Sequence, residues 1–188
     1  MLTENELIKF RRELHSYPET GWCEFVTTHK IVEKLRSFGL DPIYGRQVIN
    51  PEFVAGRNPA KVEEAKKAAL EKGVPPEFIE SMQDYTGVAA IFETGRPGPV
   101  LAIRFDMDCV DVDEAHEAGH RPFDEGWAST NPGHMHSCGH DGHATMGIAV
   151  CNWIQENLDQ FCGTIKVVFQ PAEEGVRGAR PMTETGIF

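Results

Sequence analysis

The sequence lacks the features of membrane-spanning, secreted and nucleic-acid-binding proteins. No apolar run approaches the roughly 18 residues that a transmembrane helix needs, and residues 1–10 contain no apolar signal-peptide core. Basic residues are scarce, since 18 Lys and Arg stand against 29 Asp and Glu, for a formal charge of -11. Because nucleic acids and anionic membrane surfaces would repel such a chain, we exclude both as partners.

Paired cysteines are also missing. The five cysteines form no CxxC motif, and their odd number is atypical of a disulfide framework. We therefore expect free thiols and a location in the reducing cytoplasm. The remaining composition is ordinary for a globular protein, with 40% hydrophobic and 25% charged residues, and 188 residues are enough for one well-buried domain.

Helical and strand patterns alternate along the chain, which predicts an α/β sandwich with a mixed sheet. Thr3 and Glu6 form a capping-box pattern in front of a first helix, which Pro18 ends. The turn-forming residues 94–99 favour a hairpin between the strands on either side. Further helices are expected over residues 24–38 and 144–158, and strands over 88–92, 100–105 and 164–169.

Residues from about 50 to 85 interrupt this alternation and are interpreted as an inserted helical excursion. One charged amphipathic helix stops at Gly73, and Pro75 and Pro76 open a second. Two interpretations stay open for the excursion. It forms either a plain surface addition or a flap that binds a partner or covers a substrate.

Acidic residues follow two of the expected strands directly. Asp106 and Asp108 end one strand, and Glu173 and Glu174 end another. In open α/β sheets, ligand sites gather at the carboxyl ends of strands. The loop with Cys138 and His140 precedes the buried helix and can reach the same edge, so three segments converge on one expected site.

The residue types at this edge favour metal chemistry. Each motif alone is more often a solvated turn or a packing element, but their conjunction is improbable by accident. Thiolate, imidazole and carboxylate are ligands for Zn²⁺ or Mn²⁺. The second carboxylate of the Glu173–Glu174 pair can accept a proton from a metal-bound water. A thiol enzyme that uses Cys138 would leave that pair unexplained.

Four other histidines lie outside these motifs, and the sequence assigns them no role. They are His15, His29, His116 and His120.

Four motifs in this order resemble a known family, the amidohydrolase branch of the aminoacylase and carboxypeptidase metallopeptidases. The resemblance extends over essentially the whole chain. The motifs are RELHSYPE at residues 12–19, DMD at 106–108, MHSCGHDGH at 135–143 and QPAEEG at 170–175.

The resemblance implies a three-layer α/β sandwich of the zinc-exopeptidase type, with a mixed sheet that is incomplete at its C-terminal end. It also implies a site for a pair of divalent cations, Mn or Zn. Cys138, His140 and Glu174 would be metal ligands, and Glu173 would be the general base. The residues that would orient these ligands are Asp106, Asp108, Asp141 and His143.

Within the branch, the chain is most similar to the hydrolases of p-aminobenzoyl-glutamate. The motifs GWCEF at residues 21–25 and GVRGAR at 175–180 carry this finer similarity. It implies hydrolysis of the amide bond of a small N-acyl amino acid to p-aminobenzoate and glutamate. It also implies a homo-oligomer or a hetero-oligomer, because the chain that this one resembles pairs with a related B subunit.

One part of the family pattern is missing, since no histidine follows His143. The family has two further histidine ligands downstream, together with a smaller domain for dimerisation and substrate covering. We therefore expect residues 1–188 to be the N-terminal part of the catalytic domain and to have little activity alone. The alternative is a non-catalytic relative that acts as a pairing or regulatory partner, with a structural ion or none.

Overall fold

The computed structural model describes all 188 residues and contains a four-stranded mixed sheet in the order β1-β2-β4-β3. β2 runs antiparallel to both β1 and β4, whereas β3 and β4 are parallel. The mixed α/β fold expected from the sequence is confirmed. The strands are β1 (Ile43–Tyr44), β2 (Val88–Glu93), β3 (Val100–Asp106) and β4 (Thr164–Gln170).

The hairpin expected across residues 94–99 is wrong, because β4 lies between β2 and β3. Val167 and Val168 of β4 are both fully buried although they face opposite sides of the sheet. A strand that is apolar on both faces requires a central position. β3 takes the edge instead, where Val100 and Leu101 are exposed.

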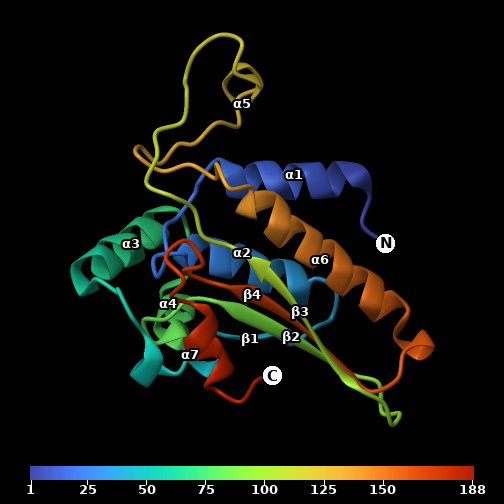
Figure 1. Cartoon of the computed structure of the whole chain (residues 1–188). Coiled ribbons are helices and arrows are strands. Elements are labelled where there is room, and N and C mark those ends of the chain that lie inside the picture. Colours follow the sequence, from blue (N-terminus) through green and yellow to red (C-terminus); the bar gives the residue numbers. More distant parts are fainter.

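Helices and loops cover both faces of the sheet, which makes three layers (Figure 1). One face packs against α2 (Phe25–Arg36) and α6 (His140–Glu156), and α1 (Glu4–His15) packs on α6 (Figure 1). The other face packs Ala89 and Val168 against Met182 of α7 (Ala179–Thr183). The capping box of α1 is present as expected, since the Thr3 side chain accepts the Glu6 N–H and the Glu6 side chain accepts the Thr3 N–H.

The long helix α6 begins four residues earlier than the sequence predicts. Gly139 precedes it with a left-handed backbone (φ 81°), a conformation that glycine adopts at little cost, so the helix starts at His140. The apolar pattern of this helix predicts buried positions for Met146 and Trp153, but the two side chains are 55% and 47% exposed.

The helical excursion forms as predicted, as α3 (Pro59–Glu71) and α4 (Pro76–Met82). The Asn58 side chain caps α3 by accepting the N–H of Ala60. Buried side chains of both helices, including Val62 and Met82, belong to the main hydrophobic core. The excursion is therefore packed against the domain.

The connection from β3 to α6 includes the short helix α5 (Arg121–Asp124) and projects away from the sheet beyond α1 (Figure 1). Two isolated bridges close its base, one between Thr20 and Cys109 and one between Val110 and Met135. All five cysteines are free, as expected from the sequence. No helix has both the length and the apolar character to cross a membrane.

Candidate metal centre

The parallel strands β3 and β4 end at the same edge of the sheet, where Asp106 pairs with Gln170. The segment that follows β4 carries Glu173 and Glu174, and α6 begins at this edge with His140. One donor atom from each of these three residues lies within 4.8 Å of the others. The segment after β3 joins them through Asp108, which contacts both His140 and Glu174, so the three segments meet as the sequence predicts.

His140 is oriented by Asp108. Its Nδ1 donates to the Asp108 carbonyl oxygen at 2.9 Å, so Nε2 is directed to the other side. Nε2 lies 3.8 Å from Glu173 Oε2 and 3.9 Å from Glu174 Oε1. Histidines that bind metals typically donate their second ring N–H to a carbonyl or carboxylate in this way.

Asp108 also holds the Glu173–Glu174 turn. Its Oδ2 accepts the backbone N–H of Glu174 at 3.1 Å. Burial alone would lower the pKa of His140, but the hydrogen bond to Asp108 and the charge of its carboxylate raise that pKa to about 9. A cation bound at Nε2 must therefore displace a proton.

The residues present fit a divalent cation. Glu174 Oε1 is buried and accepts no hydrogen bond, an arrangement that is costly for a carboxylate oxygen. A cation between Glu174 Oε1 and His140 Nε2, which lie 3.9 Å apart, would compensate this charge. Imidazole and carboxylate with a nearby thiol form a donor set suited to Zn²⁺ or Mn²⁺.

Cys138 lies beside this group but not within it. Its side chain is exposed, and a hydrogen bond to Glu174 raises its pKa. The neighbouring carboxylate disfavours the thiolate for electrostatic reasons, and a bound cation would reverse that effect. The assignment of Cys138 as a metal ligand stays a prediction.

The residues expected to orient the ligands have well-defined partners. The backbone N–H of Asp106 donates to His143 Nδ1 at 2.9 Å, which ties α6 to the end of β3. Asp141 is fully buried, and its Oδ2 accepts from His15 Nδ1 at 2.8 Å and from Arg11 Nε at 3.0 Å. Its hydrogen-bond partners thus lie on α1.

Sequence reasoning missed Glu24, which is fully buried. Its Oε1 accepts the N–H of Ala172 at 2.8 Å, and its Oε2 accepts the Thr86 hydroxyl at 2.6 Å. Burial and the nearby charge of Asp108 raise the pKa of Glu24. A glutamate between Cys23 and Phe25, in an otherwise apolar run, is the signal that could have identified it.

The sequence also assigned no role to His15 and His120. The structure places both at Glu114, in a polar cluster on the α1 side of the centre.

Comparison with known proteins supports a metallohydrolase relationship. Residues 102–188 match Peptidase family M20/M25/M40. The chain is 47% identical over 185 residues to a p-aminobenzoyl-glutamate hydrolase subunit homolog of Haemophilus influenzae. It is 42% identical over 184 residues to the indole-3-acetyl-aspartic acid hydrolase of Enterobacter agglomerans. These alignments cover 98% and 97% of the chain but only 44% and 42% of the two relatives, so the chain spans less than half of their length.

Two solved structures show the same fold. The aminobenzoyl-glutamate utilization protein of Klebsiella pneumoniae aligns with a TM-score of 0.76 and 32% identity, over 97% of this chain and 40% of that one. The YXEP protein of Bacillus subtilis, described as a dinuclear metal binding peptidase, aligns with a TM-score of 0.70 and 30% identity. That alignment covers 97% of this chain and 39% of the YXEP chain.

Proposed function

Because the chain belongs to the M20/M25/M40 peptidase family, we propose that it provides part of the active site of a metal-dependent amidohydrolase. The observation that carries this proposal is the direction of His140 Nε2 toward the Glu173–Glu174 pair, with Nδ1 bound to Asp108. Such a centre can hold a cation and also keep a free carboxylate beside it.

The proposed substrate is p-aminobenzoyl-glutamate. The two relatives named above are described as acting on p-aminobenzoyl-glutamate and on indole-3-acetyl-aspartic acid. Both compounds join an aromatic acyl group to an acidic amino acid through an amide bond. Hydrolysis adds the water hydroxyl to the carbonyl carbon, breaks the C–N bond and gives p-aminobenzoate and glutamate.

In the proposed mechanism, Cys138, His140 and Glu174 would hold divalent cations, and Asp108 fixes the orientation of the latter two. A bound pair of Mn²⁺ or Zn²⁺ ions would supply Lewis acidity and a water of lowered pKa. Glu173 takes a proton from the attacking water on a carboxylate oxygen and returns it to the leaving nitrogen. This acid–base role contributes roughly 10²–10⁴-fold to the rate.

We propose that residues 1–188 form the N-terminal part of the catalytic domain, and that this chain alone has little activity. The complete enzyme then draws further ligands and a covering domain from additional sequence, as the family resemblance implies. Pairing with a second copy or with a related B subunit is proposed on the same basis. The five free thiols support a location in the cytoplasm.

The test begins with sequencing of the gene beyond the codon for Phe188, which defines the polypeptide to assay. That polypeptide, loaded with Mn²⁺ or Zn²⁺, should release p-aminobenzoate from p-aminobenzoyl-glutamate. The Glu173→Gln variant should be roughly 10²–10⁴-fold slower, whereas the exposed Glu184→Gln control should be unaffected. Turnover that survives both Glu173→Gln and a chelator would contradict the proposal.

A further inference from the structure

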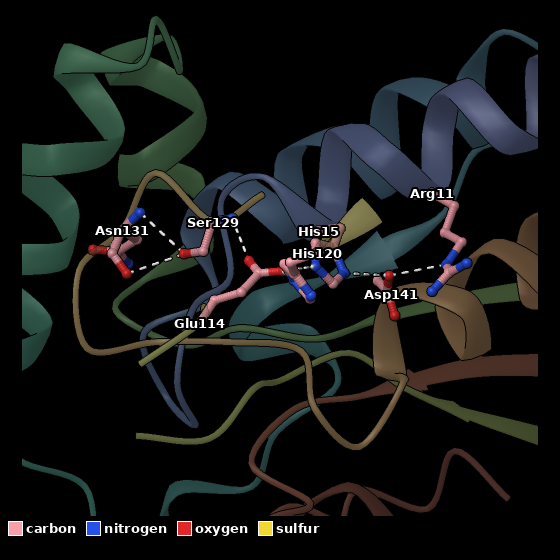
Figure 2. Close-up of polar contacts among 7 residues, drawn as sticks. All are labelled: Arg11, His15, Glu114, His120, Ser129, Asn131 and Asp141. Carbon is pink, nitrogen blue, oxygen red and sulfur yellow. Dashed lines mark hydrogen bonds and ion pairs between the residues drawn. The ribbon is translucent and has the colours of Figure 1, made fainter. Parts of the chain in front are cut away.

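His15 lies between two buried carboxylates (Figure 2). It is the last residue of α1 and is 4% exposed. Its Nδ1 is 2.8 Å from Asp141 Oδ2, and its Nε2 is 3.0 Å from Glu114 Oε1. The carboxylate side chains of Asp141 and Glu114 have no exposed surface.

This geometry defines the protonation of the imidazole. An ionised carboxylate can only accept hydrogen bonds, so each ring nitrogen of His15 must donate. His15 is therefore an imidazolium with two directed N–H groups. Burial alone would lower the pKa of His15, but the hydrogen bonds to Asp141 and Glu114 outweigh burial and raise it.

Further polar groups contact both the Asp141 and the Glu114 carboxylates. Arg11 Nε also donates to Asp141 Oδ2, at 3.0 Å. The Nε2 atom of His120 lies 2.8 Å from Glu114 Oε1, and the backbone N–H of Ser129 donates to Glu114 Oε2. Trp127 closes the other side, with its ring centroid 4.9 Å from that of His15 in an edge-on arrangement.

The two partners of His15 belong to two different segments. Asp141 follows His140 in the first turn of α6, directly after the loop with Cys138. Glu114 belongs to the projecting connection between β3 and α6, which a second contact also ties to α1, from the Thr130 N–H to the Ser16 carbonyl at 2.8 Å. His15 thus joins the start of α6 to the projecting connection.

We propose that His15 is a positioning residue for the metal centre, through an imidazolium that Asp141 and Glu114 share. Asp141, once fixed by His15, sets the direction in which the first turn of α6 presents His140 to the cation. Buried ion pairs add little net stability, so the fixed orientation is the main consequence of this one. The inference rests on the metal site of the proposed function, but it does not require turnover.

The test compares metal binding by the wild-type chain with binding by His15→Gln. Glutamine is neutral and offers donors to only one of the two carboxylates. Removal of a group that orients a ligand typically lowers metal affinity about 10–100-fold, and we expect a loss in that range for Zn²⁺ and Co²⁺ by calorimetric titration. The visible absorption of the Co²⁺-loaded protein should change as well, because it reports ligand geometry.

His120→Gln is the matched control, since His120 also contacts Glu114 Oε1 but not Asp141. This variant should keep the wild-type affinity and Co²⁺ spectrum. A folded His15→Gln with wild-type affinity and spectrum would overturn the inference. Wild-type protein that binds neither metal would instead contradict the proposed function, so the two failures are distinguishable.

A second measurement decides the matter if His15→Gln fails to fold. In ¹⁵N-labelled wild-type protein, both ring nitrogens of His15 should carry protons at neutral pH, and their signals should shift when Zn²⁺ binds. A neutral ring, or a ring that does not respond to Zn²⁺, would overturn the inference.

Discussion

Glu24 and Ala172 are 148 residues apart in the sequence and are joined by a hydrogen bond of 2.8 Å from the Ala172 N–H to Glu24 Oε1. Ala172 has a left-handed backbone (φ 50°), which a residue with a Cβ keeps only when its surroundings hold it. Glu173 follows directly. A buried acid in front of α2 therefore holds the turn that carries the proposed base.

Glu24→Ala should destabilise the fold. The substitution leaves the Ala172 N–H and the Thr86 hydroxyl buried without an acceptor, at a cost on the order of 1–3 kcal/mol for each group. Urea unfolding should show this loss, whereas Glu33→Ala on the exposed side of α2 should change stability by less than about 0.5 kcal/mol. Equal effects of the two substitutions would contradict the role of Glu24.

Substitutions of the two adjacent glutamates should have different effects on metal binding. Glu174 is the proposed ligand and Glu173 the proposed base, although both reach toward His140 Nε2. Glu174→Gln should weaken Mn²⁺ or Zn²⁺ binding, and Glu173→Gln should preserve it. Metal at 100 times its Kd stabilises a folded protein by about 2.7 kcal/mol, so thermal unfolding with and without metal provides the measurement. A Glu173→Gln variant that loses this stabilisation would make Glu173 a ligand as well.

The location of the centre could be predicted from the sequence because it depends on local patterns. Asp106, Asp108 and the Glu173–Glu174 pair each follow an apolar strand directly. The carboxyl ends of parallel strands meet at one edge, so these side chains had to lie close together.

The order of the strands could not be predicted in this way, and neither could the residues that hold the metal ligands in place. The turn after β2 has the composition of a hairpin, but the burial of β4 on both faces places β4 between β2 and β3. His15 lies 126 residues from Asp141 and 99 from Glu114. Its role depends on partners that only the folded chain brings together, and its sequence neighbours give no sign of them.

Two glycines of α6 should respond oppositely to alanine. A Cβ at Gly147 would lie 2.6 Å from the ring of Phe169 and 2.7 Å from that of Phe105, so the packing of α6 on the sheet must shift. We expect Gly147→Ala to cost about 1–3 kcal/mol. At Gly142 the nearest atom is Arg11 Nε at 3.8 Å, and the helix propensity of alanine should stabilise the fold by up to about 1 kcal/mol. Urea unfolding of both variants tests this, and a stabilised Gly147→Ala would contradict the packing.

The stability of the fold should depend on pH through Glu19, which accepts the backbone N–H groups of Val26 and Thr27 at the start of α2. Burial raises the pKa of Glu19 from 4.5 to about 7, although these hydrogen bonds act in the opposite direction. Below pH 4.5 the carboxyl is protonated in both the folded and the unfolded states. Between pH 4.5 and 7 the folded state keeps the proton and the unfolded state releases it, so rising pH favours unfolding.

Glu19→Gln isolates this effect, because all other titrating groups are common to both proteins. Across that interval the wild type should lose on the order of 3 kcal/mol of stability relative to the variant. Urea unfolding at a series of pH values measures the difference. Glu33→Gln on the exposed side of the same helix is the matched control. A constant difference for Glu19→Gln would mean that Glu19 is ionised in the folded protein throughout this range, with its charge balanced by the α2 N–H groups.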